Sequence, residues 1–188
     1  MLAAHPSAEL VAVADPDEGV RDSIAESFGV ARRCTDFAEL LSAGIDAVVI
    51  ATPAPLHTEQ SIAALEAGLH VLCEVPAVWN LDEARALVRA VRASAGSYML
   101  AENVNYFDRT VAWKRFIDEG QLGAVFYAEA EYIHHCGSLF TDAEGNPTWR
   151  AAMPPIQYCT HSLGPLLAWT GDRCVSVSGL HTGSHVRP

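Results

Sequence analysis

Strand-like and helix-like segments alternate through the first hundred residues, and this alternation constrains the fold more than any other feature. Strand-like runs lie at 9–15, 46–53, 70–76 and 97–102, with a short edge-like run at 32–35, and the run at 46–53 is continuous and rich in β-branched residues. Segments with helical spacing lie between them, at 17–28, 37–43, 57–67 and 80–96. Such alternation with short connections favours βαβ units. The sequence therefore predicts the α/β class, with a parallel sheet covered by helices on both faces.

Local signals support the helix boundaries. Asp17 precedes a segment with Val20, Ile24 and Phe28 on one face, and Gly29 follows it. Asn80 and Glu83 resemble a capping box with Asn in place of Ser or Thr. The helix after Asn80 is expected to turn its apolar side chains inward, namely Leu81, Ala84, Leu87, Val88 and Val91.

The pattern changes after Asn103. Asp108 is expected to cap a helix with Trp113, Phe116 and Ile117 inward. The alternation of side chains at 124–134 predicts a strand with one solvent-exposed face. A loop is expected at 136–156, a helix at 158–170 and another strand at 173–180. We therefore place a domain boundary near residue 102. Residues 1–102 are expected to form a truncated Rossmann-type, dinucleotide-binding domain, and 103–188 a partial α+β substrate domain.

Composition excludes several classes of partner. The chain has 188 residues and a net charge of −11, so a nucleic acid is not expected as a partner. No apolar run approaches the ~20 residues that a membrane span needs. The five cysteines are scattered and odd in number, which predicts free thiols in the reducing cytoplasm.

One expected motif is missing. A dinucleotide fold begins with a strand, a Gly-x-Gly-x-x-Gly turn and a helix, and this sequence has no such turn. Asp15 nevertheless follows a strand-like run, where the ribose-binding acid of the second strand belongs. We expect the chain to be an internal segment of a longer protein, with the first strand of the sheet absent. Without that turn the segment lacks the helix N-terminus that would bind the pyrophosphate, so one hypothesis is that this segment by itself is inactive.

Several motifs resemble the Gfo/Idh/MocA oxidoreductases. They are DAVVIATP at 46–53, then His57, then GLHVLCEVP at 68–76. The resemblance implies a Rossmann domain that holds NAD or NADP and a second α/β domain that binds a sugar or polyol. It implies that Asp15 contacts the adenosine ribose, that residues 52–57 line the dinucleotide, and that Glu74 lies near the nicotinamide end.

The usual motif of that family is Glu-Lys-Pro, and here Val75 stands in place of the lysine. Valine cannot carry a proton, so it cannot take over the role of that lysine. A narrower branch is closer, the NAD-dependent glycosidases of glycoside hydrolase family 109. The resemblance rests on EVPA at 74–77, Glu102-Asn103 with Tyr106, EYIH at 131–134, Trp149-Arg150 and YCTHSLGP at 158–165. In that group the sugar is oxidised at C3, the aglycone is eliminated, water adds, and the keto group is reduced. Cys159 stands where a proline is usual.

Four residues are the catalytic candidates: His161, Glu74, Tyr106 and Tyr158. An imidazole acts as a base near neutral pH, and a strand-end carboxylate can take a proton or hold a sugar hydroxyl. The alternative for His161 is a structural histidine whose hydrogen bonds are made within the core. The alternative for Glu74 is a structural acid that caps the next element. For the tyrosines, packing against cofactor or sugar is the alternative to proton transfer, since a phenol needs a nearby cation to serve as a base.

The cofactor-binding candidates are Asp15, Thr52, Pro53, His57, Glu74 and Asn103. A carboxylate at Asp15 accepts ribose hydroxyls and repels a 2′-phosphate, which favours NAD. Arg32 and Arg33 lie on the next strand, so NADP stays an alternative cofactor. No metal site is expected, because adjacent residues such as His134 and His135 point to opposite faces of a strand.

The sequence thus predicts an NAD(P)-dependent oxidoreductase that acts on a hydroxyl of a sugar or cyclitol by hydride transfer. The alternatives are an NAD-dependent glycosidase or an inactive fragment of either. The expected partner is a small carbohydrate, with homo-oligomer formation through the C-terminal domain of the full-length protein.

Overall fold

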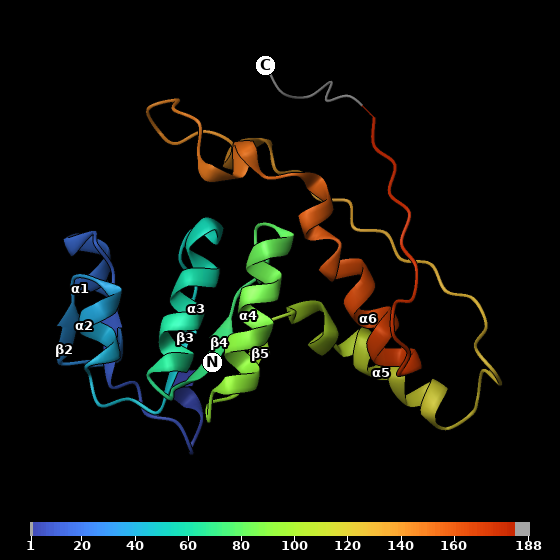
Figure 1. Cartoon of the computed structure of the whole chain (residues 1–188), viewed down its shortest axis with the longest axis horizontal. Coiled ribbons are helices and arrows are strands. Elements are labelled where there is room, and N and C mark those ends of the chain that lie inside the picture. The colour runs from blue at the N-terminus through green and yellow to red at the C-terminus, as the bar shows by residue number, and fades with distance from the viewer. Residues whose placement is uncertain (1, 183–188) are drawn as a thin grey trace. The chain divides into compact units, whose positions relative to one another are not determined.

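The computed structural model describes residues 2–182, which form two compact units (Figure 1). Of the described residues, the first unit comprises 2–52, 56–73 and 80–99. The second comprises 53–55, 74–79 and 100–182. No helix among the described residues combines the length and the hydropathy that a membrane crossing needs.

The first unit alternates strands and helices, as the sequence predicts. Its elements are η1 (Leu2–Ala4), β1 (Ala12–Ala14), α1 (Glu18–Phe28), β2 (Arg32–Cys34), α2 (Phe37–Leu41), β3 (Ala47–Ile50), α3 (His57–Glu66), β4 (His70–Cys73), α4 (Leu81–Ala93) and β5 (Tyr98–Leu100). The short helix η2 (Ala54–Leu56) precedes α3. The prediction of an α/β, Rossmann-type architecture with parallel strands is confirmed.

The strands form two sheets. β1 pairs with β2 in parallel, and β3, β4 and β5 form a second sheet in that order. Ala47 of β3 pairs in parallel register with His70 of β4. Helix α3 packs on β3 and β4, and α4 runs beside α3 (Figure 1). The core of this half consists of Val48, Ile50, Ala64, Leu65, Val71, Cys73 and Leu87.

Side-chain caps explain where several helices begin. The Asp17 carboxylate accepts a hydrogen bond from the Val20 amide, and Gly29 ends α1 with a φ of 67°. The Asn80 side chain accepts bonds from the amides of Asp82 and Glu83. The Glu83 carboxylate accepts from the Asn80 side-chain amide at 2.7 Å. The capping signals in the sequence are therefore confirmed.

Two of the side chains expected to face inward do not. Leu81 is 74% exposed and Val88 is also exposed, whereas Leu87 of the same helix is buried. Leu81 is the first residue of α4, where the helix has not yet turned onto α3. The apolar stripe of α4 is therefore narrower than its sequence pattern predicts.

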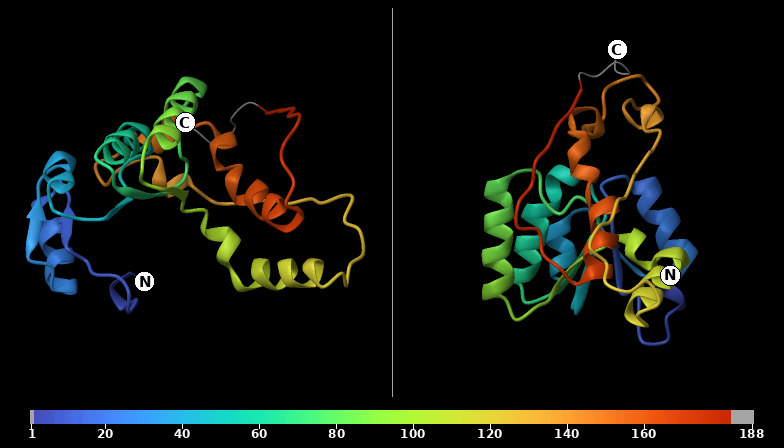
Figure 2. Two further views of the ribbon diagram at one scale, coloured as in Figure 1. Left: turned by 60° about the horizontal axis from the view of Figure 1, so that its bottom comes forward. Right: turned by 90° about the vertical axis from the view of Figure 1, so that its right-hand side faces the viewer.

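The second unit contains helices and extended chain. Its elements are η3 (Asn103–Tyr106), α5 (Asp108–Asp118), η4 (Gly137–Leu139), η5 (Trp149–Ala152), η6 (Pro155–Tyr158) and α6 (Thr160–Thr170). Helices α5 and α6 pack side by side (Figure 2), and the Trp169 indole donates to the Thr110 carbonyl at 2.9 Å. The peptide bond between Val75 and Pro76 is cis.

The boundary of α5 differs from the prediction. Asp108 is the first residue of the helix, and Phe107 occupies the cap without a side-chain hydrogen bond. Trp113, expected to face inward, is exposed, while Phe116 and Ile117 are partly covered. Asp108 instead places a carboxylate in the first turn, where the helix dipole favours negative charge.

The two strands predicted at 124–134 and 173–180 are wrong for the structure described. Both segments are extended chain without ladder hydrogen bonds, and beyond β5 the described residues hold only one isolated bridge, between Thr141 and Pro147. Phe126 is 97% exposed and Val175 86%. Alternation specifies which faces a strand presents, but a strand also needs a neighbour to take its backbone groups.

Candidate active site

The second unit holds a buried ion-pair geometry between a carboxylate and an imidazole. Glu102 follows β5 and is 4% exposed, and His161 lies in the first turn of α6 and is 9% exposed. Glu102 Oε1 lies 2.8 Å from His161 Nδ1 and also accepts the Val104 amide at 3.1 Å. A side chain from the end of a strand and one from the start of a helix thus meet inside the unit.

Two tyrosine rings pack on His161. The centroid of the Tyr132 ring lies 4.5 Å from that of His161, and the Tyr158 ring stacks at 5.6 Å with an interplanar angle of 26°. Partial burial is the main factor that raises the pKa of Tyr132, which is still 41% exposed, and the negative charges that Tyr158, Cys136 and Glu102 carry when ionised raise it further. The Tyr132 phenol therefore stays protonated and can serve as a hydrogen-bond donor.

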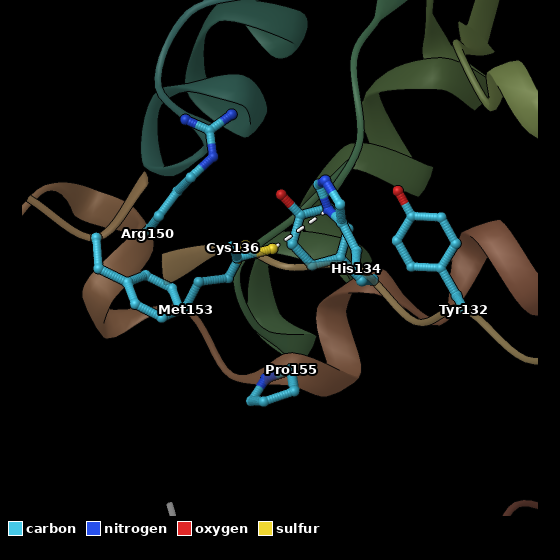
Figure 3. Close-up of a pocket in the computed structure, with 8 residues that line it drawn as sticks. Tyr132, His134, Cys136, Arg150, Met153 and Pro155 are labelled. Carbon is cyan, nitrogen blue, oxygen red and sulfur yellow. Dashed lines mark hydrogen bonds between the residues drawn. The ribbon is translucent and has the colours of Figure 1, made fainter. Parts of the chain in front are cut away.

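A cavity of about 200 Å³ lies against these tyrosines (Figure 3). Its lining residues are Tyr132, His134, Cys136, Phe140, Arg150, Met153, Pro155 and Tyr158. Cys136 Sγ lies 3.2 Å from His134 Nδ1, and the Arg150 guanidinium lies 4.2 Å from the centroid of the Trp149 ring. His161 is not a lining residue, but it contacts two of them. Aromatic faces mixed with hydroxyl, imidazole and guanidinium groups suit a hydroxylated ligand.

The predicted catalytic residues are only partly brought together. His161 and Tyr158 stack on one another. Among the described residues, the Tyr106 ring contacts neither of them, and Tyr106 lies exposed at the end of η3. Glu74 is exposed and directly follows β4.

The predicted cofactor residues lie after the strands of the first unit or beside η3. Asp15 follows β1, and its Oδ1 accepts the Asp17 amide at 2.8 Å. Asp15 Oδ2 has no hydrogen bond among the described residues. This partly buried carboxylate therefore keeps an oxygen for a ribose hydroxyl, which fits the adenosine end of NAD.

The residues after β3 are engaged with one another. The Thr52 hydroxyl donates to Gln60 Oε1 at 2.6 Å, and Nε2 of the buried His57 lies 2.8 Å from the Thr52 carbonyl oxygen. These bonds fix the loop that continues into the exposed Pro53. Asn103 opens η3 and is exposed. Thr52 and His57 thus shape the loop after β3.

Sequence reasoning did not select Glu102 or Tyr132 as site residues. The signal for Glu102 was present, because it is an acid just beyond the end of a strand, as Asp15 and Glu74 are. Nothing in the spacing shows that its carboxylate turns into the protein toward a helix begun 58 residues later. Among residues 2–182, no group of three or more His, Cys, Asp or Glu side chains is arranged to hold a metal ion.

Parallel strands with helical crossovers and an acid after β1 define a Rossmann-type, dinucleotide-binding class of protein. Residues 1–102 match the family described as "Oxidoreductase family, NAD-binding Rossmann fold", Gfo/Idh/MocA. The chain belongs to this family, and the predictions of the family and of an NAD-binding domain are confirmed.

Relatives include both kinds of enzyme that the sequence resembles. The chain is 32% identical over 154 residues to scyllo-inositol 2-dehydrogenase (NAD(+)) of Bacillus subtilis, covering 76% of this chain and 45% of that protein. It is 32% identical over 137 residues to a glycosyl hydrolase family 109 protein of Solibacter usitatus, covering 69% and 31%. Thus the chain spans less than half the length of these curated relatives.

A solved structure shares the fold. The scyllo-inositol dehydrogenase of Lactobacillus casei, with bound NAD(H) and scyllo-inositol, superposes with a TM-score of 0.61 at 26% identity. The match covers 65% of this chain and 37% of that chain.

Proposed function

We propose that the protein is an NAD-dependent oxidoreductase that oxidises a hydroxyl of a sugar or cyclitol, with His161 as the base. The observation that carries this proposal is the buried imidazole of His161, held by Glu102 and packed against two tyrosines beside a cavity. The named substrates of its relatives, inositols among them, support the substrate class.

NAD, when bound, supplies the acceptor for the hydride. Asp15 binds the adenosine ribose, and Thr52, Pro53, His57 and Asn103 line the cofactor. Glu74 lies at the nicotinamide end and orients the substrate. A carboxylate at Asp15 repels a 2′-phosphate, and this supports NAD over NADP.

The chain's own side chains handle the proton. His161 takes the proton of the substrate hydroxyl, because Val75 occupies the position where ordinary members of the family have lysine. Tyr132 and Tyr158 pack against the sugar ring, and the protonated Tyr132 phenol donates a hydrogen bond. Tyr106, outside this cluster, packs against substrate or cofactor.

A second candidate function is glycoside hydrolysis by oxidation, elimination, addition and reduction. The 32% identity to a family 109 protein and the shared Glu-Val-Pro sequence support it. In that reaction the base at His161 serves the oxidation step in the same way, and the cofactor ends in the state in which it began.

One experiment separates the two candidates. The full-length protein is incubated with inositols and free sugars plus NAD, and in parallel with aryl glycosides without added NAD. Steady NADH formation from a free polyol supports the dehydrogenase. Aglycone release without net NADH supports the glycosidase, and neither reaction with any substrate of the panel contradicts the proposal.

The proposal also covers the cellular location and the oligomeric state of the protein. The scattered, odd number of cysteines supports the cytoplasm as its location, and the substrate domain is proposed to mediate homo-oligomer formation.

A further inference from the structure

Glu102 uses its two carboxylate oxygens unequally. Oε1 lies 2.8 Å from His161 Nδ1 and accepts the Val104 amide at 3.1 Å. Oε2 is enclosed and has no hydrogen-bond partner among the described residues. A buried carboxylate is costly unless its charge is compensated. This carboxylate is therefore stabilised most when the imidazole beside it carries a positive charge.

The packing around Glu102 holds it in place. Helix α6 approaches η3 at Gly164, where a Cβ atom would lie 2.9 Å from Glu102 Cγ and 3.0 Å from Asn105 Oδ1. Glycine is thus needed for this close approach. The carboxylate is confined on one side by the helix that also carries His161.

The other titratable groups that face the pair do not replace Glu102 as its counter-charge. Tyr132 and Tyr158 pack on the His161 ring, and Tyr132 is held in its neutral form. Cys136 and His134 contact one another, and the His134 ring lies beside both tyrosines. Arg150 lines the cavity, while Glu102 is the carboxylate within hydrogen-bond distance of His161.

We propose that Glu102 is a positioning residue that holds the neutral His161 as the Nδ1–H tautomer and compensates its charge once it is protonated. Nδ1 donates to Glu102 Oε1, so the lone pair of Nε2 is available to a substrate hydroxyl. One proton moves from the substrate oxygen to Nε2, and Glu102 remains a carboxylate throughout. The catalytic meaning of this inference rests on the proposed function; the tautomer does not.

The tautomer is measured directly, without cofactor or substrate. Protein with ¹⁵N-labelled histidine is examined by NMR correlations between ring nitrogens and ring carbon protons, and His161 is assigned from the signals lost in His161→Asn. We expect the neutral ring to carry its proton on Nδ1. A neutral ring protonated on Nε2 in the native protein overturns the proposal, and this test needs no other variant to fold.

Substitution tests the acceptor. Glu102→Gln replaces a carboxylate, which can only accept, with an amide that can accept from Nδ1 or donate to it, so the preference of the neutral His161 ring for the Nδ1–H tautomer is expected to weaken. Glu102→Asp keeps a carboxylate and is expected to retain part of that preference. An unchanged tautomer in a folded Glu102→Gln variant overturns the proposal.

Steady-state kinetics of the full-length protein test the catalytic role of Glu102. Glu102→Gln is expected to lower kcat by about 10²-fold with little change in KM, less than the ~10⁴-fold loss known where a carboxylate orients a catalytic imidazole. Equal kcat in the two proteins overturns the catalytic role. If the native protein shows the Nδ1–H tautomer but oxidises no polyol, the proposed function fails and the tautomer assignment stands.

Discussion

At the scale of single residues, Tyr98 makes the first unit sensitive to alkali. Its enclosed hydroxyl lies beside Cys73 and Ser61, which are both fully buried. Burial, and then the charge and hydrogen bond of Cys73, raise the Tyr98 pKa well above its usual value of about 10. The protonated phenol is therefore favoured in the folded state.

Because the folded-state pKa is raised, this stabilisation is fully present below the unfolded pKa and is lost as pH rises above it. We expect the free energy of unfolding to fall above pH ~10, by up to about 1.4 kcal/mol per pH unit from this group. Urea unfolding over a pH series measures the slope, which Tyr98→Phe should flatten and Tyr106→Phe, an exposed control, should not. An equal slope in native protein and Tyr98→Phe would count against the assignment.

The site illustrates what single residues reveal in the sequence. His161 and Tyr158 were selected from the sequence, and the structure stacks them. Glu102 was not, although it follows a strand as Asp15 and Glu74 do. Position after a strand predicts nearness to a cleft, but the direction of a side chain depends on the tertiary packing of η3 and α6. That packing has no local signal in the sequence.

At the scale of elements, α4 depends on its cap. Asn80 accepts hydrogen bonds from two amides of the first turn. We expect Asn80→Ala to lower the free energy of unfolding by about 1 kcal/mol, and Asn80→Ser, which restores an acceptor, to recover most of it. Thermal and urea unfolding measure both. Equal stability of the Ala and Ser variants would show that the cap contributes nothing.

The turn between α4 and β5 has no room for a side chain at Gly96. A Cβ atom there would lie 2.0 Å from the Leu69 carbonyl oxygen, so the backbone would have to shift. Gly96→Ala is expected to cost about 3 kcal/mol or more, at the upper end of overpacking effects. Ala95→Ser, at an exposed neighbour, is the matched control and should cost little. A Gly96→Ala protein as stable as this control contradicts the packing described.

Elements were predictable where their signals are local. The caps at Asp17 and Asn80 and the β-branched run of β3 marked helices and strands correctly. The segments 124–134 and 173–180 also show strand patterns, yet they remain unpaired in the structure described. Strand formation there depends on a neighbouring strand, which the alternation of side chains does not specify.

At the scale of the whole molecule, the proposed function makes cofactor choice depend on Asp15. We expect Asp15→Asn to weaken NAD binding by the full-length protein about 10²-fold and to reduce its preference over NADP, because the variant loses charge-assisted bonds and the repulsion of a 2′-phosphate. Asp36→Asn, which alters the acid that caps α2, is the control. Calorimetry with both cofactors measures the ratio. An unchanged ratio would remove Asp15 from the site.

The same calorimetry addresses the reading that the 188-residue chain is inactive by itself. This sequence has no Gly-x-Gly-x-x-Gly turn to bring a helix N-terminus to the pyrophosphate. Micromolar binding of NAD by this chain would refute that reading, and no measurable binding would support it.

The identity of the proton acceptor is the central claim, and turnover of a His161→Asn variant of the full-length protein tests it most directly. NADH formation from the best polyol is compared in native protein, His161→Asn and the control His5→Asn, which changes an exposed histidine of the first unit, with NAD affinity measured in each. We predict that His161→Asn lowers kcat by about 10²- to 10⁴-fold while NAD affinity and the His5→Asn control stay unchanged. Full turnover by His161→Asn would contradict the account.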